Sequence, residues 1–424
     1  MSQILAVPVK ITAIIARRIL DSRGESTVEV DLSSRGVMVR VAAPSGKSRG
    51  KWEVQPFPDG GVDEAVERVR ELLAPELSGM NADRQQQIDE KLHEVDGTEQ
   101  FRRIGGNTAY AISIAAALLS ATAHKKPLYQ KLAGSSKVKI SLPLGNVVGG
   151  GAHAKGKRTD IQEFLVVPTK ASSAIQAAEA NVKVHSEVAR LAVQQGSSMI
   201  GKGDEGGYVL DMTTDQALDL ISKACQTVSL GTGADVRIGL DVASSSMWDE
   251  KQQAYVYKRD ERKLSEGEQI EFILDLIERY RLVYVEDPLH EDAFEAFSEL
   301  RKKAGGALIC GDDLLVTNAT RIDQAVKHGS ANAIIIKTNQ VGTLSDSRRA
   351  VEKAQAAGYV TVMSHRSGEV CSGELAQIAV GLSCPMIKCG VIGGERISKL
   401  NELVRIEEDA EKRKILAGMA RIPS

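Results

Sequence analysis

The 424-residue sequence predicts an α/β protein whose larger second part is a (β/α)8-type barrel, preceded by a smaller part of strands and helices. The evidence for the barrel is a set of six short apolar runs that each stop at an ionisable residue. These end residues are Asp241, Glu286, Asp312, Lys337, His365 and Lys388. They lie 45, 26, 25, 28 and 23 positions apart, with helical stretches such as 268–280 and 345–357 between them. Repeated strand–helix units have about this length and close into a barrel.

The first part of the chain has the pattern of strands followed by helices. Apolar and β-branched residues over 27–32 and 37–41, separated by the turn-forming residues 33–36, predict a hairpin. Apolar residues then recur at helical spacing between Val62 and Leu73, which predicts the first helix.

Two more helices are expected before the barrel, with Asn81 and Asn107 as N-caps and Gly97 at the end of the first of them. Gly134-Ser135-Ser136 then gives the best candidate linker, because helical periodicity changes to strand-like periodicity after it. We therefore expect two domains, at residues 1–134 and 135–424.

Composition excludes several classes of protein. The 54 Lys and Arg nearly balance the 56 Asp and Glu, and aromatic residues are scarce, so neither nucleic acid nor an anionic membrane is an expected partner. Five cysteines without a C-x-x-C pair disfavour a disulfide scaffold or a thiolate zinc site. The sequence contains no export signal and no apolar run of about 18 residues. A cytoplasmic location is therefore expected.

The carboxyl ends of parallel barrel strands meet at one face, so the six end residues should share a cavity. Asp241, Glu286 and Asp312 would repel one another there, and a divalent cation would remove the conflict. All-oxygen ligands favour Mg2+ or Mn2+ over Zn2+. The alternative is that these acids form salt bridges at the strand ends.

Lys337 and Lys388 end strands on the far side of that predicted metal site. A lysine flanked by a cation and a second ammonium should have a lowered pKa, so it could act as a base. Each lysine could equally bind an anionic group of the substrate, and Schiff-base chemistry is a third option.

Three loops carry further candidate residues. His365-Arg366-Ser367 supplies an imidazole, a guanidinium and a hydroxyl, which suit a phosphate or carboxylate, although a structural loop is possible. Residues 201–207 form a glycine-rich loop with two acids, which could approach a ligand or could be a surface turn. Residues 44–48 end like a nucleotide-binding P-loop, but Val41 stands where that motif needs glycine.

Nine short motifs, in this order and spacing, resemble the enolase family over nearly the whole chain. They are 21–24 (DSRG), 149–154 (GGGAHA), 161–164 (IQEF), 203–207 (GDEGG), 285–289 (VEDPL), 311–314 (GDDL), 337–344 (KTNQVGTL), 364–369 (SHRSGE) and 403–408 (LVRIEE). The resemblance implies an N-terminal α+β domain and a barrel with a non-standard ββαα start. It also implies Mg2+-dependent dehydration of 2-phospho-D-glycerate to phosphoenolpyruvate, and the reverse reaction.

The resemblance further implies a role for each matching residue. Asp241, Glu286 and Asp312 would hold the first Mg2+, and Ser48 would help bind a second that arrives with substrate. Lys337 would remove the C2 proton, and Glu205 would act as acid toward the C3 hydroxide, with Glu163 and His153 supporting it. The implied substrate-binding residues are His153, Glu163, Glu286, Asp312, Lys337, His365, Arg366, Ser367 and Lys388.

The departures from the family pattern are concentrated in residues 45–53, where Lys47, Arg49 and Trp52 replace the usual alanine, threonine and histidine. Two alternatives follow. The chain could be an enolase-like paralogue with impaired loop closure that acts as a binding or scaffold protein. It could also be a superfamily enzyme acting on an unphosphorylated acid, although Arg366 and Ser367 argue against this. The family forms dimers and octamers, so a homo-oligomer is expected.

Overall fold

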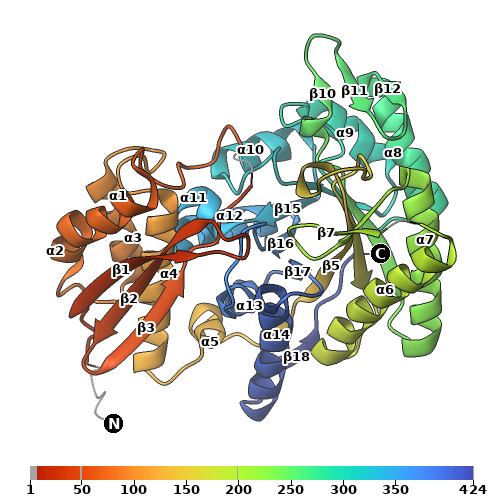
Figure 1. Ribbon diagram of the computed structural model, residues 1–424. Coiled ribbons are helices and arrows are strands. Elements are labelled where there is room, and N and C mark those ends of the chain that lie inside the picture. The colour runs from red at the N-terminus through yellow and green to blue at the C-terminus, as the bar shows by residue number, and fades with distance from the viewer. Residues whose placement is uncertain (1–6, 48–49, 198, 424) are drawn as a thin grey trace.

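The computed structural model describes residues 7–47, 50–197 and 199–423, and its largest feature is a closed barrel of eight strands (Figure 1). The ring closes because the last strand, β17, pairs with the first, β5. Its strands are β5 (Leu142–Gly149), β6 (Glu163–Pro168), β9 (Val236–Asp241), β13 (Tyr284–Glu286), β14 (Leu308–Gly311), β15 (Ala333–Ile336), β16 (Val360–Ser364) and β17 (Met386–Gly390). The predicted barrel is therefore confirmed.

The barrel begins with a ββαα unit, as the family resemblance implied. β5 and β6 are antiparallel, and so are β6 and β9, whereas every later pair in the ring is parallel. Two helices, α6 (Ala174–Gln194) and α7 (Thr214–Thr232), stand between β6 and β9. The later helices of the outer layer are α8 (Glu266–Tyr280), α9 (Phe294–Lys303), α10 (Ala319–His328), α12 (Leu344–Ala356), α13 (Glu374–Gly381) and α14 (Gly394–Lys412).

Strand register places the polar end residues at one level of the barrel. Asp241 pairs with Glu163 on one side and with Glu286 on the other, and Ser364 pairs with Lys388. The apolar residues that precede them in each strand are buried, because one face of the barrel sheet packs against the side chains inside the ring and the other against the outer helices. The polar residues at the strand ends therefore lie at the open end of the barrel.

Smaller elements extend this frame. β7 (Met199–Lys202) and β8 (Tyr208–Leu210) continue the sheet beyond β5 and carry the glycine-rich loop between them. A second small sheet contains β10 (Trp248–Asp249), β11 (Ala254–Tyr257) and β12 (Arg262–Leu264), and β4 (Val138–Ile140) pairs with β18 (Leu416–Met419). The short helical segments are η2 (Gly151–His153), η3 (Ser244–Ser246) and α11 (Thr338–Val341).

The N-terminal part lies beside the barrel and contains an antiparallel sheet packed on helices (Figure 1). Its strands are β1 (Ala13–Leu20), β2 (Ser26–Ser34) and β3 (Val37–Ala42), of which the β2–β3 hairpin was predicted. Its helical segments are α1 (Gly61–Arg68), the π-helical η1 (Val69–Leu73), α2 (Ala74–Leu77), α3 (Gln85–Asp96), α4 (Gly106–Ala123) and α5 (Leu128–Ala133). The proposed domain division at residue 134 falls in the connection from α5 to β4.

The two asparagine N-caps predicted for this part are wrong, whereas Gly97 does follow the end of α3, with φ of 70°. The residue before α4 is Gly105, with φ of 85°, and a Cβ there would lie 2.8 Å from the backbone of Phe57. Only glycine suits that position, so Asn107 lies within the first turn instead. Its Oδ1 accepts a hydrogen bond from Asn339 of the barrel.

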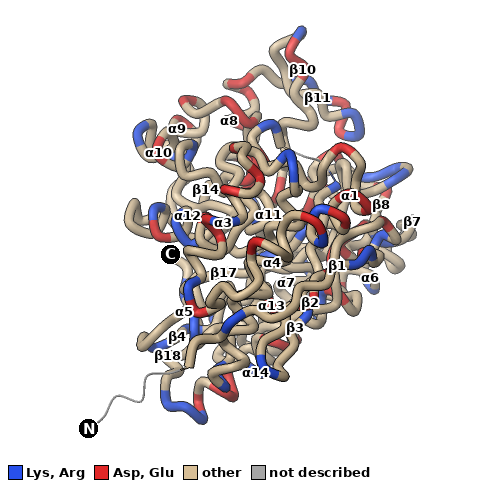
Figure 2. The backbone as a smooth tube through the Cα atoms, turned by 90° about the vertical axis from the view of Figure 1, so that its left-hand side faces the viewer, with Lys and Arg blue, Asp and Glu red and all other residues tan. Residues whose placement is uncertain are grey.

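Surface charge and helix character agree with the composition. In Figure 2, segments with Lys and Arg are interspersed with segments with Asp and Glu over the described chain. Within the described residues, no helix combines the length and apolar character needed to cross a membrane.

Candidate active site

The open end of the barrel holds a cavity of about 150 Å³. Most of the residues predicted to act together contribute to its wall. They are His153, Glu163, Glu205, Asp241, Asp312, Lys337, His365, Arg366, Ser367 and Lys388. Glu286 lies fully buried behind them, and Ser48 lies outside the described residues.

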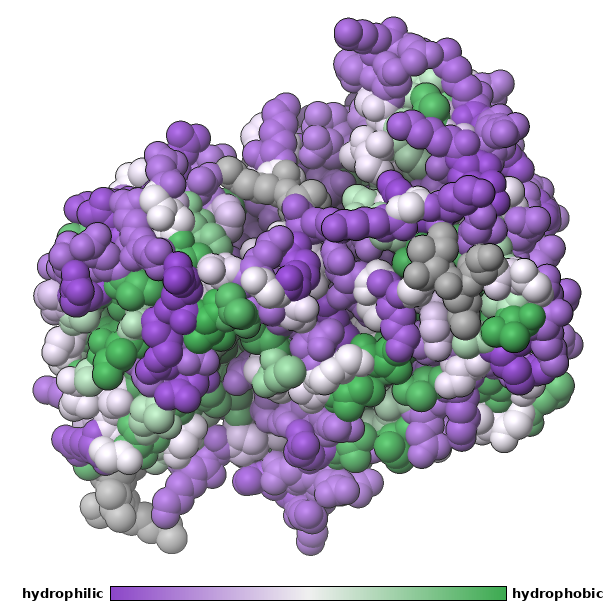
Figure 3. Space-filling model, in the orientation of Figure 1, coloured by the Kyte–Doolittle hydropathy of each residue, from purple (hydrophilic) through white to green (hydrophobic). Residues whose placement is uncertain are grey.

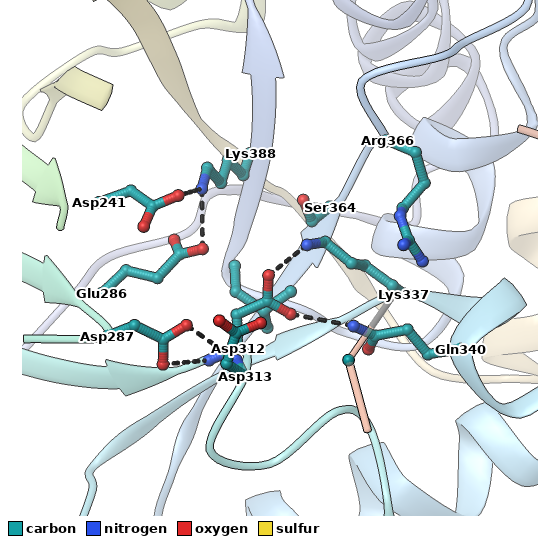
Figure 4. Close-up of polar contacts among 12 residues, drawn as sticks. Asp241, Glu286, Asp287, Asp312, Asp313, Lys337, Gln340, Ser364, Arg366 and Lys388 are labelled. Carbon is teal, nitrogen blue, oxygen red and sulfur yellow. Dashed lines mark hydrogen bonds and ion pairs between the residues drawn. The ribbon is translucent and has the colours of Figure 1, made fainter. Parts of the chain in front are cut away.

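Lys388 contacts several of the carboxylates that line this site (Figure 4). Its Nζ is 2.8 Å from Asp241 Oδ2, 2.8 Å from Glu286 Oε1 and 3.1 Å from Glu163 Oε2. Burial opposes the charge on Lys388, but these carboxylates outweigh it and raise the pKa of the ammonium well above its ordinary value. The ammonium group of Lys388 thus bridges two of the three predicted metal ligands, Asp241 and Glu286.

Lys337 forms an ion pair with the third predicted ligand, Asp312, whose Oδ1 also accepts a hydrogen bond of 3.0 Å from Gln340 (Figure 4). We expected a lowered pKa for Lys337, but its pKa is raised. Burial and the charge of Arg366 act to lower it, and the adjacent Asp312 carboxylate outweighs them. A lowered pKa of Lys337 would therefore require the Asp312 carboxylate to pair with a different positive charge.

The cavity concentrates more carboxylates than the lysines neutralise. Burial, followed by the charge of Asp241, raises the pKa of Glu286 well above its ordinary value. Burial and Asp312 likewise raise the pKa of Asp313 to about 7. Asp287, Asp312 and Asp313 place carboxylate oxygens within 4.8 Å of one another. This group shares only Asp312 with the predicted ligand set. Its donors are all oxygen and carry surplus negative charge, which fits a hard divalent cation.

On the opposite side, two carboxyl groups lie between two histidines. His153 Nδ1 is 3.0 Å from Glu163 and 3.8 Å from Glu205, and His365 Nε2 is 2.9 Å from Glu205 Oε2. Burial and the charge of Glu205 raise the pKa of Glu163 to about 7. Burial would also raise the pKa of Glu205, but His365 and His153 outweigh it and lower that pKa well below its ordinary value. The two neighbouring carboxyl groups therefore differ, with the pKa of Glu163 raised and that of Glu205 lowered.

The glycine-rich loop between β7 and β8 is part of the cavity wall and not a free surface turn. Gly206 has φ of 86°, and its carbonyl accepts a hydrogen bond of 3.0 Å from buried His185. A Cβ on Gly207 would lie 2.5 Å from the side chain of Asn146. Glycine is required at both positions to bring Glu205 to the cavity.

Arg366 is anchored by a residue that sequence reasoning did not assign to the site. Both of its terminal nitrogens lie 3.1 Å from Glu53 Oε2, and one donates to Asn339 Oδ1 at 2.8 Å. Glu53 comes from the N-terminal part, so this buried pair joins the two parts of the chain at the cavity. The position of Glu53 in the 45–53 motif was the sequence feature that could have assigned it to the site. Gln162, Asp313 and Arg396 were likewise not assigned to the site from the sequence.

The departures in residues 45–53 have partners on the barrel. Lys47 Nζ lies 2.8 Å from Asp204 Oδ2, beside the glycine-rich loop. The Arg321 guanidinium lies over the Trp52 ring, 5.2 Å from its centroid. Arg49 lies outside the described residues.

Comparisons with known proteins agree over most of the chain. The family model described as "Enolase, N-terminal domain" matches residues 11–132, and "Enolase, C-terminal TIM barrel domain" matches residues 137–423. The enolase of Methanosphaera stadtmanae is 48% identical over 395 residues, covering 93% of this chain and 95% of the relative. The enolase of Methanothermobacter thermautotrophicus is 47% identical, covering 93% of this chain and 95% of the relative. The enolase of Pyrobaculum aerophilum is 44% identical, covering 92% of this chain and 94% of the relative.

Proposed function

This chain belongs to the enolase family, and from that premise we propose how its cavity performs the enolase reaction. The protein is a phosphopyruvate hydratase, a carbon–oxygen lyase of glycolysis that interconverts 2-phospho-D-glycerate and phosphoenolpyruvate. The observation that carries the assignment of roles is the convergence of lysines, carboxylates and a guanidinium on one cavity of a family-matched barrel. Neither a scaffold role nor an unphosphorylated substrate is favoured.

The reaction is metal-dependent, and we propose Mg2+ as the metal. Asp241, Glu286 and Asp312 would hold it, supported by their all-oxygen chemistry and by the raised pKa of Glu286. When bound, the metal supplies positive charge where the substrate carboxylate gains electron density. A second Mg2+, arriving with substrate and held in part by Ser48, is expected from the resemblance alone.

Lys337 is the proposed base that removes the C2 proton. Its Nζ needs a lone pair for this, and Asp312 keeps it protonated in the free site. If Asp312 held a metal ion, burial and the charges of Arg366 and Lys388 would favour the neutral amine of Lys337. Lys388 then remains as a fixed positive charge facing the substrate carboxylate.

Glu205 and Glu163 are the proposed acid that delivers a proton to the departing C3 hydroxide. The raised pKa of Glu163 supports it as the source of the proton, and His153 lies 3.0 Å from Glu163 and 3.8 Å from Glu205. We propose that Glu205 takes up a proton from Glu163 and passes it to the departing hydroxide, which leaves as water, while His153 stabilises the charge left on Glu163.

Arg366 and Ser367 are the proposed phosphate anchors, and His365 helps hold the substrate. The buried ion pair with Glu53 fixes the Arg366 guanidinium in the cavity wall. A guanidinium can give two parallel hydrogen bonds to a phosphate, which supports a phosphorylated acid as substrate.

Location and assembly are also proposed. Free cysteines at all five positions support a reducing compartment, and we propose the cytoplasm. Figure 3 shows apolar side chains on the surface of the N-terminal part. The exposed apolar residues of its sheet include Ile15, Leu20 and Met38, which are 56%, 66% and 52% exposed. Exposed apolar surface of this kind supports a homo-oligomer, either a dimer or an octamer.

The division of roles can be tested by measuring two activities of the same variants with 2-phosphoglycerate and Mg2+. Ultraviolet absorbance of the enol phosphate reports dehydration, and loss of deuterium from C2-labelled substrate reports proton abstraction. Lys337→Ala should lose both by at least about 100-fold, because the base is gone. Glu205→Gln should lose dehydration by a similar factor and keep measurable exchange.

Lys302→Ala, which removes an exposed lysine on α9, is the matched control and should keep both activities. Equal loss of exchange and dehydration in Glu205→Gln would contradict the separate roles. A folded, Mg2+-loaded parent protein without enol-phosphate absorbance would contradict the function itself.

A further inference from the structure

We propose that Arg396 is a positioning residue that holds His365 in the tautomer with its proton on Nε2, so that His365 donates to Glu205. The inference rests on the proposed function for its meaning in catalysis. The tautomer itself follows from the hydrogen bonds around the imidazole alone.

Arg396 stands in the first turn of α14 and is fully buried. One terminal nitrogen is 2.8 Å from His365 Nδ1 and 2.7 Å from the Arg366 carbonyl oxygen. The other donates to the carbonyl oxygens of Ser367 at 2.7 Å and Asp204 at 3.0 Å. One side chain therefore ties the histidine loop, residues 365–369, to the glycine-rich loop, residues 203–207.

The tautomer follows from what each partner can do. A guanidinium has donors and no acceptor, so His365 Nδ1 must present a lone pair to it. The backbone N–H of Gly390 also points at Nδ1, at 3.4 Å. With Nδ1 unprotonated, the ring is neutral and its proton is on Nε2. Nε2–H then donates to Glu205 Oε2 across 2.9 Å.

The opposite tautomer would be unfavourable at both ends of the ring. Nδ1–H would face a buried guanidinium donor, and the Nε2 lone pair would face a carboxylate oxygen. Burial, helped by the charge of Arg396, lowers the pKa of His365 to about 4, which agrees with a neutral ring. The consequence for the reaction is that Oε2 of Glu205 is always occupied by a donor. Only its Oε1, on the side of His153 and Glu163, remains to exchange a proton.

The direct test is 15N NMR of the imidazoles in the full-length protein labelled at histidine, without substrate. The His365 signals are assigned by their absence in His365→Gln. We expect Nδ1 of His365 to have the shift of an unprotonated nitrogen and Nε2 that of a protonated one. A protonated Nδ1 would overturn the proposal, whatever the enzyme's activity.

Variants separate positioning from general packing. In Arg396→Met, we expect a mixture of tautomers and a kcat lower by at least about tenfold, with KM changed less than about threefold. Lys399→Met is the matched control, because Lys399 is also fully buried on α14 and donates to the Val370 carbonyl beside Glu369, away from His365. It should keep the wild-type tautomer.

Arg396→Lys, which keeps one donor for Nδ1, should restore the Nε2–H tautomer and part of kcat. An Arg396→Met protein with wild-type tautomer and kcat would also overturn the proposal. The NMR measurement on the parent protein decides the tautomer even if Arg396→Met does not fold. Absence of enolase turnover with the expected tautomer would count against the proposed function and not against this geometry.

Discussion

Lys47 adds a positive charge at the mouth of the cavity, where the family motif usually has alanine. It lines the cavity and pairs with Asp204 while remaining partly exposed. In Lys47→Ala, kcat/KM should fall severalfold at low salt, because the substrate is an anion and loses one attractive charge at the entrance. The loss should shrink at high salt as the charges are screened. Steady-state kinetics at two ionic strengths measures both effects.

Stability should change little in that variant, by less than about 1 kcal/mol, since exposed ion pairs contribute little. Lys51→Ala is the control, because Lys51 is an exposed lysine of the same segment outside the cavity. An equal, salt-sensitive loss of kcat/KM in Lys51→Ala would show that general charge and not the position of Lys47 matters.

Residues at strand ends could be predicted from periodicity, and loop residues such as Glu205 and Arg366 from the family motifs. The contacts that hold those loop residues in place could not be predicted. Asp241 and Glu286 follow from periodicity, because parallel register puts successive strand ends at one level. The Glu53–Arg366 pair depends on how a loop of the N-terminal part lies across the barrel, 313 positions away in sequence. Arg396 lies in the first turn of α14, and the neighbouring sequence does not predict that its guanidinium contacts His365.

At the scale of elements, the end of β17 must lie against the glycine-rich loop for the site to form. A Cβ on Gly390 would be 2.2 Å from the Glu205 carbonyl oxygen and 3.0 Å from Arg396 Cγ. Gly390→Ala should therefore displace the loop, lower turnover by at least about tenfold and destabilise the fold by about 1–3 kcal/mol. Turnover and urea denaturation measure the two effects.

Gly267→Ala in α8 is the control, since a Cβ there meets nothing within 4 Å. We expect it to keep turnover and to be neutral or stabilising by up to about 1 kcal/mol. If Gly390→Ala retained full turnover, the close approach of β17 to the loop would not be needed for catalysis.

The elements that sequence patterns missed have a common physical reason. β1 alternates between exposed and partly buried positions without a fully buried face, so its periodicity is weak. The helix N-caps were misassigned because close packing of Gly105 on the preceding loop, and not side-chain capping, decides where α4 begins. Short apolar runs that each end at an ionisable residue and recur at regular spacing, as in the barrel strands, carry a stronger signal.

At the scale of the whole molecule, buried polar contacts join the N-terminal part to the barrel. Asp89 of α3 accepts a hydrogen bond of 3.0 Å from the Ser345 N–H at the start of α12, and His93 lies 2.8 Å from Asp346. These pairs are about 250 positions apart in sequence, so they become visible only once both parts are folded. The buried pair of Glu53 with Arg366 at the cavity wall likewise needs both parts of the chain.

The pH dependence of the unfolding free energy should reflect the titration of His185, a buried residue behind the glycine-rich loop. Burial lowers its pKa in the folded protein to about 4, whereas the unfolded chain binds the proton near pH 6.5. Between these values the unfolded state holds more protons, so the free energy of unfolding falls as pH falls from about 6.5 to 4. His185→Gln keeps an N–H donor for Gly206 and cannot titrate. Its unfolding free energy should therefore depend less steeply on pH, by about one proton, in urea denaturation series over that range.

His93→Gln provides a control of opposite sign. The hydrogen bond to Asp346 raises the pKa of His93, so its contribution to stability is present below about pH 6.5 and is lost as pH rises through the folded-state pKa. Removing it should lower the unfolding free energy at acidic pH and leave the alkaline limit nearly unchanged. If both variants altered the slope in the same direction, the two histidines would not differ in protonation as burial and Asp346 require.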